Sequence, residues 1–205
     1  MKLNYLDSSL VAILRGITPK ESIAHADILY SAGFRAIEVP LNSPKALTSI
    51  RQLCQHFQAK ADSCVIGAGT VTDSKEVEDL ATTGAKLIVT PNTDVTVISK
   101  AKALGFYVIA GFMTTSEAFA AIKAGADALK LFPAHVLGVA YVKALKSILP
   151  PMIPIWAVGG MQVDNIKKFL AAGCSGVGLG TSLYRAGQTI KQTQDRAHAF
   201  VHLLR

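Results

Sequence analysis

Three ionisable side chains lie in or directly after apolar segments, where charged residues are uncommon. Lys130 interrupts the apolar run 127–133, and a buried lysine there would lose its hydration. Desolvation lowers the pKa of an ammonium group and gives a neutral amine, which is a nucleophile for ketones. An exposed strand-end lysine, with its stem on apolar surface, explains the same run without any chemistry.

Glu38 and Arg15 strengthen the chemical interpretation of Lys130. Glu38 falls inside a second apolar run and Arg15 directly follows a third. A carboxylate is a suitable general base for the proton transfers of imine formation, and a guanidinium forms a planar fork that matches a carboxylate. Each residue alone fits a structural ion pair equally well. Together they predict a site that binds a keto acid as an imine on Lys130.

Two glycine-rich segments predict a phosphate site. Gly159 and Gly160 follow one predicted strand, and Gly180 and Thr181 follow the last one. In α/β barrels the loops after the seventh and eighth strands often bind phosphate through backbone N–H groups. A single Gly-Gly pair usually marks only a turn, but two such loops at these positions favour a phosphorylated substrate.

Thr70 ends another predicted strand and has two interpretations: it binds the substrate carboxylate, or it caps a turn. No histidine pattern indicates a metal. His198 and His202 are four residues apart in the predicted final helix, but no third ligand is near, so they fit an exposed helix face. His135 follows the Lys130 segment and fits a loop position better than a substrate contact. We expect neither a metal nor a cofactor.

The elements that position these residues form a repeating strand–helix pattern. Five helical segments end at a glycine that precedes a strand, as αL caps do. Thr18-Pro19, Ser43-Pro44, Asp73 and Thr115 mark helix starts, and residues 188–204 form the final helix. The eight predicted strands are residues 10–14, 34–39, 64–68, 86–90, 106–110, 127–132, 153–158 and 175–180. This pattern predicts one α/β domain over residues 1–205, a (β/α)8 TIM barrel, with a doubly wound open sheet as the alternative.

Composition fits an ordered enzyme-sized domain. Of the 205 residues, 50% are hydrophobic and 17% are charged, and the formal net charge is +7. The basic residues are dispersed and no aromatic residues alternate with them, so the charge favours an anionic small molecule over nucleic acid. Apolar runs are too short for a membrane span or a signal peptide, and the three scattered cysteines indicate no disulfide framework. We expect a cytoplasmic protein without a membrane or nucleic-acid partner.

Motifs along almost the whole chain resemble those of the KDPG/KHG aldolase family. These motifs are Leu14-Arg15-Gly16, Ile37-Glu38-Val39, Gly67-Ala68-Gly69-Thr70-Val71, Thr90-Pro91-Asn92, Leu129-Lys130-Leu131-Phe132-Pro133, Val158-Gly159-Gly160 and Gly178-Leu179-Gly180. The resemblance implies a metal-independent class I aldolase on a (β/α)8 barrel that releases pyruvate, commonly as a homotrimer.

The resemblance also implies roles for single residues. Lys130 is the Schiff-base lysine and Glu38 the acid/base, and Arg15 and Thr70 bind the pyruvate carboxylate. The phosphate ligands it implies are Gly159, Gly160, Gly180 and Thr181.

Two segments are most similar to family members that cleave 2-dehydro-3-deoxy-6-phosphogalactonate to pyruvate and D-glyceraldehyde 3-phosphate. These are residues 40–44 and 157–160. Val158 lacks a hydroxyl that the gluconate-specific members have there and that can read the C4 configuration. Departures from the family pattern at 112–113, 134–135 and 181–182 bear on this substrate preference. The alternative substrates are the C4-epimeric 6-phosphogluconate compound and 4-hydroxy-2-oxoglutarate.

Two other classes of function fit parts of the sequence. A phosphate-binding barrel isomerase or epimerase would use Glu38 as its base and would not need Lys130. A non-catalytic anion-binding module, for sugar phosphates or nucleic acid, would explain the positive charge but not a lysine inside an apolar strand.

Overall fold

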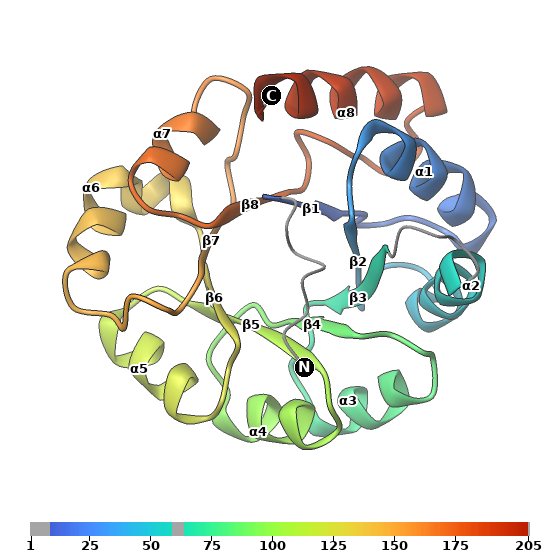
Figure 1. Cartoon of the computed structure of the whole chain (residues 1–205). Coiled ribbons are helices and arrows are strands. Elements are labelled where there is room, and N and C mark those ends of the chain that lie inside the picture. Colours follow the sequence, from blue (N-terminus) through green and yellow to red (C-terminus); the bar gives the residue numbers. More distant parts are fainter. Residues whose placement is uncertain (1–8, 59–63, 205) are drawn as a thin grey trace.

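Eight parallel strands close into a barrel in the order β1 to β8, with β8 paired back to β1. The computed structural model describes residues 9–58 and 64–204, and Figure 1 shows the barrel along its axis. The strands are β1 (Leu10–Ile13), β2 (Ala36–Pro40), β3 (Val65–Gly69), β4 (Leu87–Val89), β5 (Tyr107–Phe112), β6 (Ala128–Leu131), β7 (Ile155–Val158) and β8 (Gly176–Leu179). The (β/α)8 prediction is confirmed, and the open doubly wound sheet is wrong.

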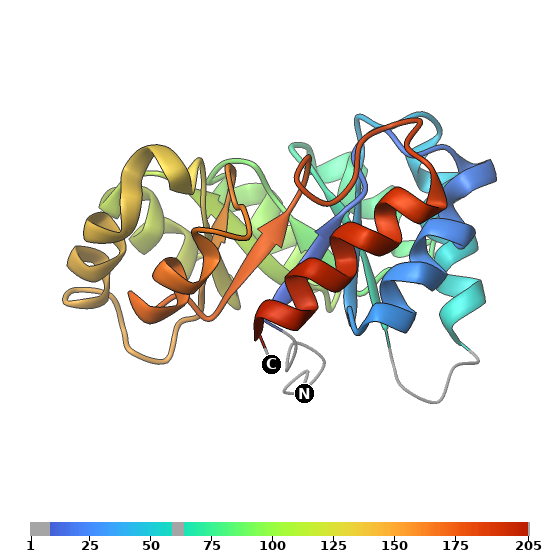
Figure 2. The same ribbon diagram turned by 90° about the horizontal axis from the view of Figure 1, so that it is seen from above.

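A helix follows each strand and covers the outside of the barrel (Figure 1). The helices are α1 (Pro19–Ala32), α2 (Ala46–Gln58), α3 (Ser74–Ala81), α4 (Val95–Ala103), α5 (Thr115–Lys123), α6 (Ala134–Lys146), α7 (Ile166–Ala171) and α8 (Ile190–Leu204). In Figure 2 strand β8 points upward, and the long loop that joins it to α8 lies along the upper edge. Helix α8 packs beside α1, so the first and last units close the ring.

Local sequence signals start most of these helices. Glu21 accepts hydrogen bonds from the hydroxyl and the N–H of Thr18, which precedes Pro19 at the start of α1. Asp73 accepts from the N–H of Lys75 at the start of α3. Such contacts satisfy N–H groups that have no partner within the helix. The five glycines predicted to end helices all have positive φ.

The predicted starts of two helices, α2 and α8, are wrong. Helix α2 begins at Ala46 rather than after Ser43, because Lys45 has a left-handed φ of 49° that a helix cannot contain. Helix α5 begins at Thr115, as predicted, and Thr114 caps it. The hydroxyl of Thr114 accepts from the N–H of Glu117, and the side chain of Glu117 accepts from the N–H of Thr114. Helix α8 begins at Ile190 and not at 188.

The apolar core has two parts. The larger one lies between the strands and the surrounding helices. The smaller one fills the inside of the barrel and consists of Val11, Ala36, Val65, Leu87, Val89, Ile109, Ala128 and Trp156. Side chains two residues apart on a strand share a face. Ala36 and Ala128 therefore place Glu38 and Lys130 on the inner face, one layer nearer the carboxyl ends of the strands. No helix in the described part of the chain is long and apolar enough to cross a membrane.

Candidate active site

The carboxyl ends of β1, β2 and β6 bring the three predicted chemical groups to one end of the barrel. Glu38 lies in the middle of β2, where it pairs in register with Ile13 and with Gly67 of β3. Lys130 lies inside β6 and pairs with Gly111 and Trp156. Arg15 follows β1 after one intervening residue, Leu14. The prediction that these residues share one end of the barrel is confirmed, although Glu38 is inside its strand and not at its end.

Glu38 is buried with only 2% of its surface exposed. Its Oε2 atom makes no hydrogen bond with any residue that the structure describes. Burial raises the pKa of this carboxyl to about 7, and the positive charges of Lys130 and Arg15 oppose that rise. A carboxyl with a pKa near neutrality exchanges protons readily at physiological pH, which is the property that a general acid/base needs.

Gly69 makes the space for this carboxylate. A Cβ atom built on Gly69, at the end of β3, would lie 1.6 Å from Oε2 of Glu38. No other residue type fits there without moving the carboxylate. Gly69 of the Gly67-Ala68-Gly69-Thr70 motif therefore leaves room for the side chain of Glu38 on the neighbouring strand β2.

Lys130 is 5% exposed, and its pKa is lowered. Burial is the main cause, Arg15 adds to it by charge repulsion, and Glu38 acts in the opposite direction. Its Nζ atom lies 5.1 Å from the ring centroid of Phe132, over the face of the ring. Lys130 and Glu38 form no ion pair within the described structure, so neither group fixes the other in its charged form. Loss of hydration thus shifts the pKa of each group in the direction of its neutral form.

Arg15 is held by two side chains from neighbouring units. Its Nη1 donates to Oδ1 of Asn42 at 2.7 Å, and its Nη2 donates to the hydroxyl of Thr70 at 3.4 Å. Thr70 has a φ of 57°, which is unusual for a β-branched residue and costs on the order of 1–3 kcal/mol. Such strain is typical of functional sites. Sequence reasoning gave Asn42 no role in the site, because nothing in a single sequence indicates that it reaches Arg15.

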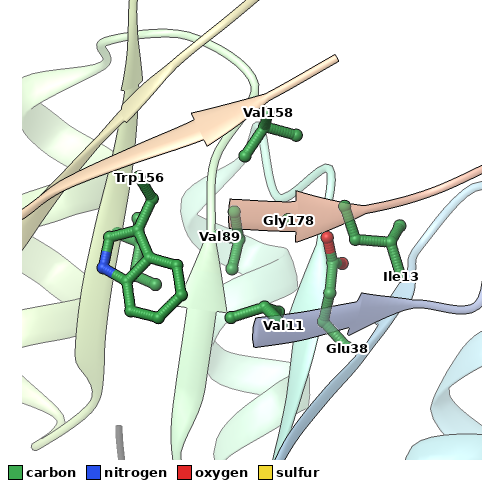
Figure 3. Close-up of a pocket in the computed structure, with 8 residues that line it drawn as sticks. Val11, Ile13, Glu38, Val89, Trp156, Val158 and Gly178 are labelled. Carbon is green, nitrogen blue, oxygen red and sulfur yellow. The ribbon is translucent and has the colours of Figure 1, made fainter. Parts of the chain in front are cut away.

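Apolar side chains from β1, β4, β5 and β7 line the space beside Glu38. Figure 3 shows Glu38, Ile13 and Val158 around the same small cavity, with the Trp156 indole also on its wall. The cavity has a volume of about 10 Å³ and its remaining lining is Val11, Val89, Ile109 and Gly178. These groups provide the low-dielectric surroundings that raise the pKa of Glu38.

The loop after β7 is a tight turn packed on the start of α6. Gly159 and Gly160 both have positive φ, and the carbonyl of Gly159 accepts from the N–H of His135 at 3.2 Å. Nδ1 of His135 also lies 3.2 Å from that carbonyl. A Cβ on Gly160 would overlap the imidazole ring at 2.3 Å. His135 therefore covers the turn, a contact that the sequence did not indicate.

The loop after β8 forms a second turn, residues 180–184, here called the β8 turn. Leu183 and Tyr184 both donate their N–H groups to the carbonyl of Gly180 at 2.9 Å. Neither bond uses the N–H groups of Thr181 or Ser182. The four residues predicted to bind phosphate thus lie on adjacent turns, because β7 and β8 are neighbours in the barrel.

Metal-ligating side chains do not gather anywhere in the described residues: no group of three or more His, Cys, Asp or Glu is placed to hold an ion. His198 and His202 are exposed on α8, as the sequence predicted.

A family model described as KDPG and KHG aldolase matches residues 4–200. The chain belongs to the KDPG and KHG aldolase family. The 2-dehydro-3-deoxy-6-phosphogalactonate aldolase of Escherichia coli (strain K12) is 48% identical over 196 residues, covering 96% of this chain and 94% of that protein. The family and this relative identify the chain as an aldolase, and therefore as a lyase.

Solved structures agree with this membership. The structure described as "Native KDPGal structure" superposes with a TM-score of 0.92 at 46% identity and covers 100% of this aldolase and 95% of that chain. A cube-shaped protein cage, designed by fusing symmetric oligomeric domains, also has a TM-score of 0.92, at 47% identity. It covers 95% of this chain and 71% of the cage chain.

The pKa of Glu38 predicts the pH dependence of catalysis. Because a base must be deprotonated, kcat/KM should fall about tenfold per pH unit below a midpoint near pH 7 and level off above it. The amine of Lys130 must be neutral as well, and its lowered pKa favours that form. A pH profile of pyruvate release measures this, with Glu38→Gln as the comparison. A midpoint near the ordinary glutamate value of 4.5 would contradict the role of the buried carboxyl.

Proposed function

We propose that this aldolase cleaves 2-dehydro-3-deoxy-6-phosphogalactonate to pyruvate and D-glyceraldehyde 3-phosphate through an imine on Lys130. The observation that carries the proposal is the burial of Lys130 beside an equally buried Glu38, with the pKa of the lysine lowered and that of the glutamate raised. The name of the E. coli relative supports the choice of substrate.

The reaction begins at the C2 ketone. The neutral amine of Lys130 attacks C2, and ionised Glu38 moves the excess proton from the nitrogen to the C2 oxygen to give a carbinolamine. That oxygen leaves as water with a proton from solvent, an iminium ion forms, and Glu38 is ionised again. Arg15 and Thr70 hold the C1 carboxylate, which fixes the ketone against the amine. The positive charge of the iminium then withdraws electrons from C3.

Cleavage of the C3–C4 bond follows from that charge. Glu38, now ionised, takes the proton of the C4 hydroxyl, so the C4 oxygen becomes the aldehyde of glyceraldehyde 3-phosphate. The bonding electrons move to C3 and neutralise the iminium as an enamine. Protonation of C3 and addition of water to the imine release pyruvate and restore Lys130. The balance of atoms and electrons requires no metal or redox cofactor.

The phosphate end of the substrate lies at the two glycine turns in this proposal. Backbone groups of the loop after β7 and of the β8 turn bind the phosphate, namely those of Gly159, Gly160, Gly180 and Thr181. The two turns are adjacent because β7 pairs with β8. The formal charge of +7 on the chain favours association with such a multiply charged anion.

Val158 bears on the choice between the two C4 epimers. It lines the same cavity as Glu38, the group that must reach the C4 hydroxyl (Figure 3). An apolar side chain there offers no hydrogen bond to a C4 hydroxyl of either configuration, and a threonine would offer one.

Pyruvate release from the two C4 epimers, measured side by side in EDTA, tests the substrate. We expect kcat/KM for the galactonate compound to exceed that for the gluconate compound by about tenfold or more, which corresponds to about 1.4 kcal/mol. Val158→Thr, a nearly isosteric change, should narrow the ratio. Equal rates in the unchanged protein would refute the galactonate assignment and leave the aldolase in place.

We also propose that the protein acts in the cytoplasm, in galactonate degradation, as a homotrimer. Cys54 and Cys174 remain thiols, as expected in a reducing compartment. Exposed apolar side chains occur on neighbouring units at Met113, Phe119 and Val136, and such groups are typical of subunit contacts.

Light scattering measures the oligomeric state directly. We expect a particle of three chains of 21.7 kDa each at micromolar concentration. Phe119→Lys should shift the distribution toward smaller species, because burying the added charge is unfavourable. A monodisperse monomer would contradict the trimer.

A further inference from the structure

Two arginines bind one backbone carbonyl in the β8 turn. The carbonyl oxygen of Thr181 accepts from Nε of Arg185 at 3.2 Å and from Nη1 of Arg196 at 3.4 Å. Arg185 is close in sequence, whereas Arg196 comes from the second turn of α8. Neither residue has a part in the function proposed above.

Gln188 fixes the position of both arginines. Its Oε1 accepts from the backbone N–H of Arg185 and from Nη1 of Arg196, both at 3.0 Å. Its Nε2 donates to the carbonyl of Leu183 at 2.9 Å and to the hydroxyl of Thr193 at 2.6 Å. The β8 turn is therefore fastened to α8 at several points.

A buried histidine extends this network to α1. Nδ1 of His25 lies 2.8 Å from the hydroxyl of Thr193, and its ring contacts Tyr184 edge to face at 5.0 Å. Both His25 and Thr193 are buried. The outer side of the β8 turn thus rests on two packed helices, which limits the directions in which its peptide groups can point.

The two arginines on the Thr181 carbonyl also set the direction of the Ser182 N–H. A trans peptide is planar, and its C=O and N–H point in opposite directions. The peptide whose oxygen belongs to Thr181 carries the N–H of Ser182, so two guanidinium groups on the oxygen direct that N–H to the other side of the turn. Positive charge at the oxygen also polarises the peptide and strengthens the N–H as a donor.

We infer that Arg185 and Arg196 are positioning residues for a phosphate monoester. They hold the Thr181–Ser182 peptide so that the N–H of Ser182 faces the phosphate, and their charges partly offset the nearly two negative charges that a phosphate monoester has at neutral pH. This inference rests on the proposed function, since it assumes that the substrate phosphate lies at the β8 turn. It adds the N–H of Ser182 to the groups that donate hydrogen bonds to the phosphate. Helix α8 then contributes to phosphate binding through Arg196.

Condensation of pyruvate with two aldehydes isolates the phosphate. Glyceraldehyde 3-phosphate and glyceraldehyde have the same reacting carbonyl and differ only in the phosphate. We expect Arg196→Met and Arg185→Met each to raise the KM for the phosphorylated aldehyde on the order of tenfold, as for one weakened charge-assisted hydrogen bond. The KM for glyceraldehyde and the kcat for both aldehydes should stay unchanged.

Arg51→Met is the matched control. Arg51 is exposed on α2, so this change removes the same charge without touching the β8 turn. An equal rise in KM for the control would attribute the effect to net charge and overturn the inference. An equal rise for both aldehydes would assign it to general disturbance of the site, with the same consequence.

The outcome for the unchanged protein separates the two proposals. If it condenses both aldehydes with pyruvate and the Arg196 and Arg185 variants behave as it does, only the positioning role is wrong. If it condenses neither aldehyde, the proposed function fails, and the inference that depends on it fails as well.

Discussion

Burial of an amine and a carboxyl together, without an ion pair between them, is the constraint on which the rest of the site depends. In water Lys130 would be charged and unreactive, and Glu38 would be a weak base. Inside the barrel, loss of hydration penalises both charged forms, so the pKa of the lysine falls and that of the glutamate rises to about 7. A direct contact would restore the charges. The two residues come from β2 and β6 and make no ion pair in the described structure.

This arrangement lowers the stability of the fold and explains several residue choices around it. The pKa of Glu38 is higher in the folded chain than its ordinary value of 4.5, so the folded state binds the proton more tightly. Ionisation of the buried carboxyl therefore lowers the free energy of unfolding. This loss of stability is absent below pH 4.5, grows as the pH rises, and is complete above about pH 7. The apolar layer that includes Val11 and Trp156 offsets it by burying hydrocarbon below the site. Gly69 leaves the space that the carboxylate of Glu38 occupies. Thr70, with its left-handed φ, accepts a hydrogen bond from Arg15 through its hydroxyl.

Much of this could be predicted from the sequence, because both the fold and the chemical groups have local signals. Glycine caps and apolar runs define eight units, and closure of eight units brings the strand ends together. Lys130 and Glu38 are conspicuous as ionisable residues inside apolar strands. Contacts between units were beyond reach: nothing local shows that Asn42 binds Arg15, that His135 covers Gly160, or that Arg196 reaches Thr181. The left-handed φ of Lys45, which delays α2, likewise depends on surroundings that a sequence pattern does not contain.

Reductive trapping shows directly whether Lys130 carries pyruvate as an imine. The protein is incubated with pyruvate, reduced with borohydride, digested and examined by mass spectrometry, with Lys130→Met as the control. We expect a stable pyruvate-derived group on the peptide that contains Lys130, more abundant above pH 7 than below it, and no such group in the variant. An unmodified Lys130 in the protein that releases pyruvate, or a group trapped on another lysine, would contradict it.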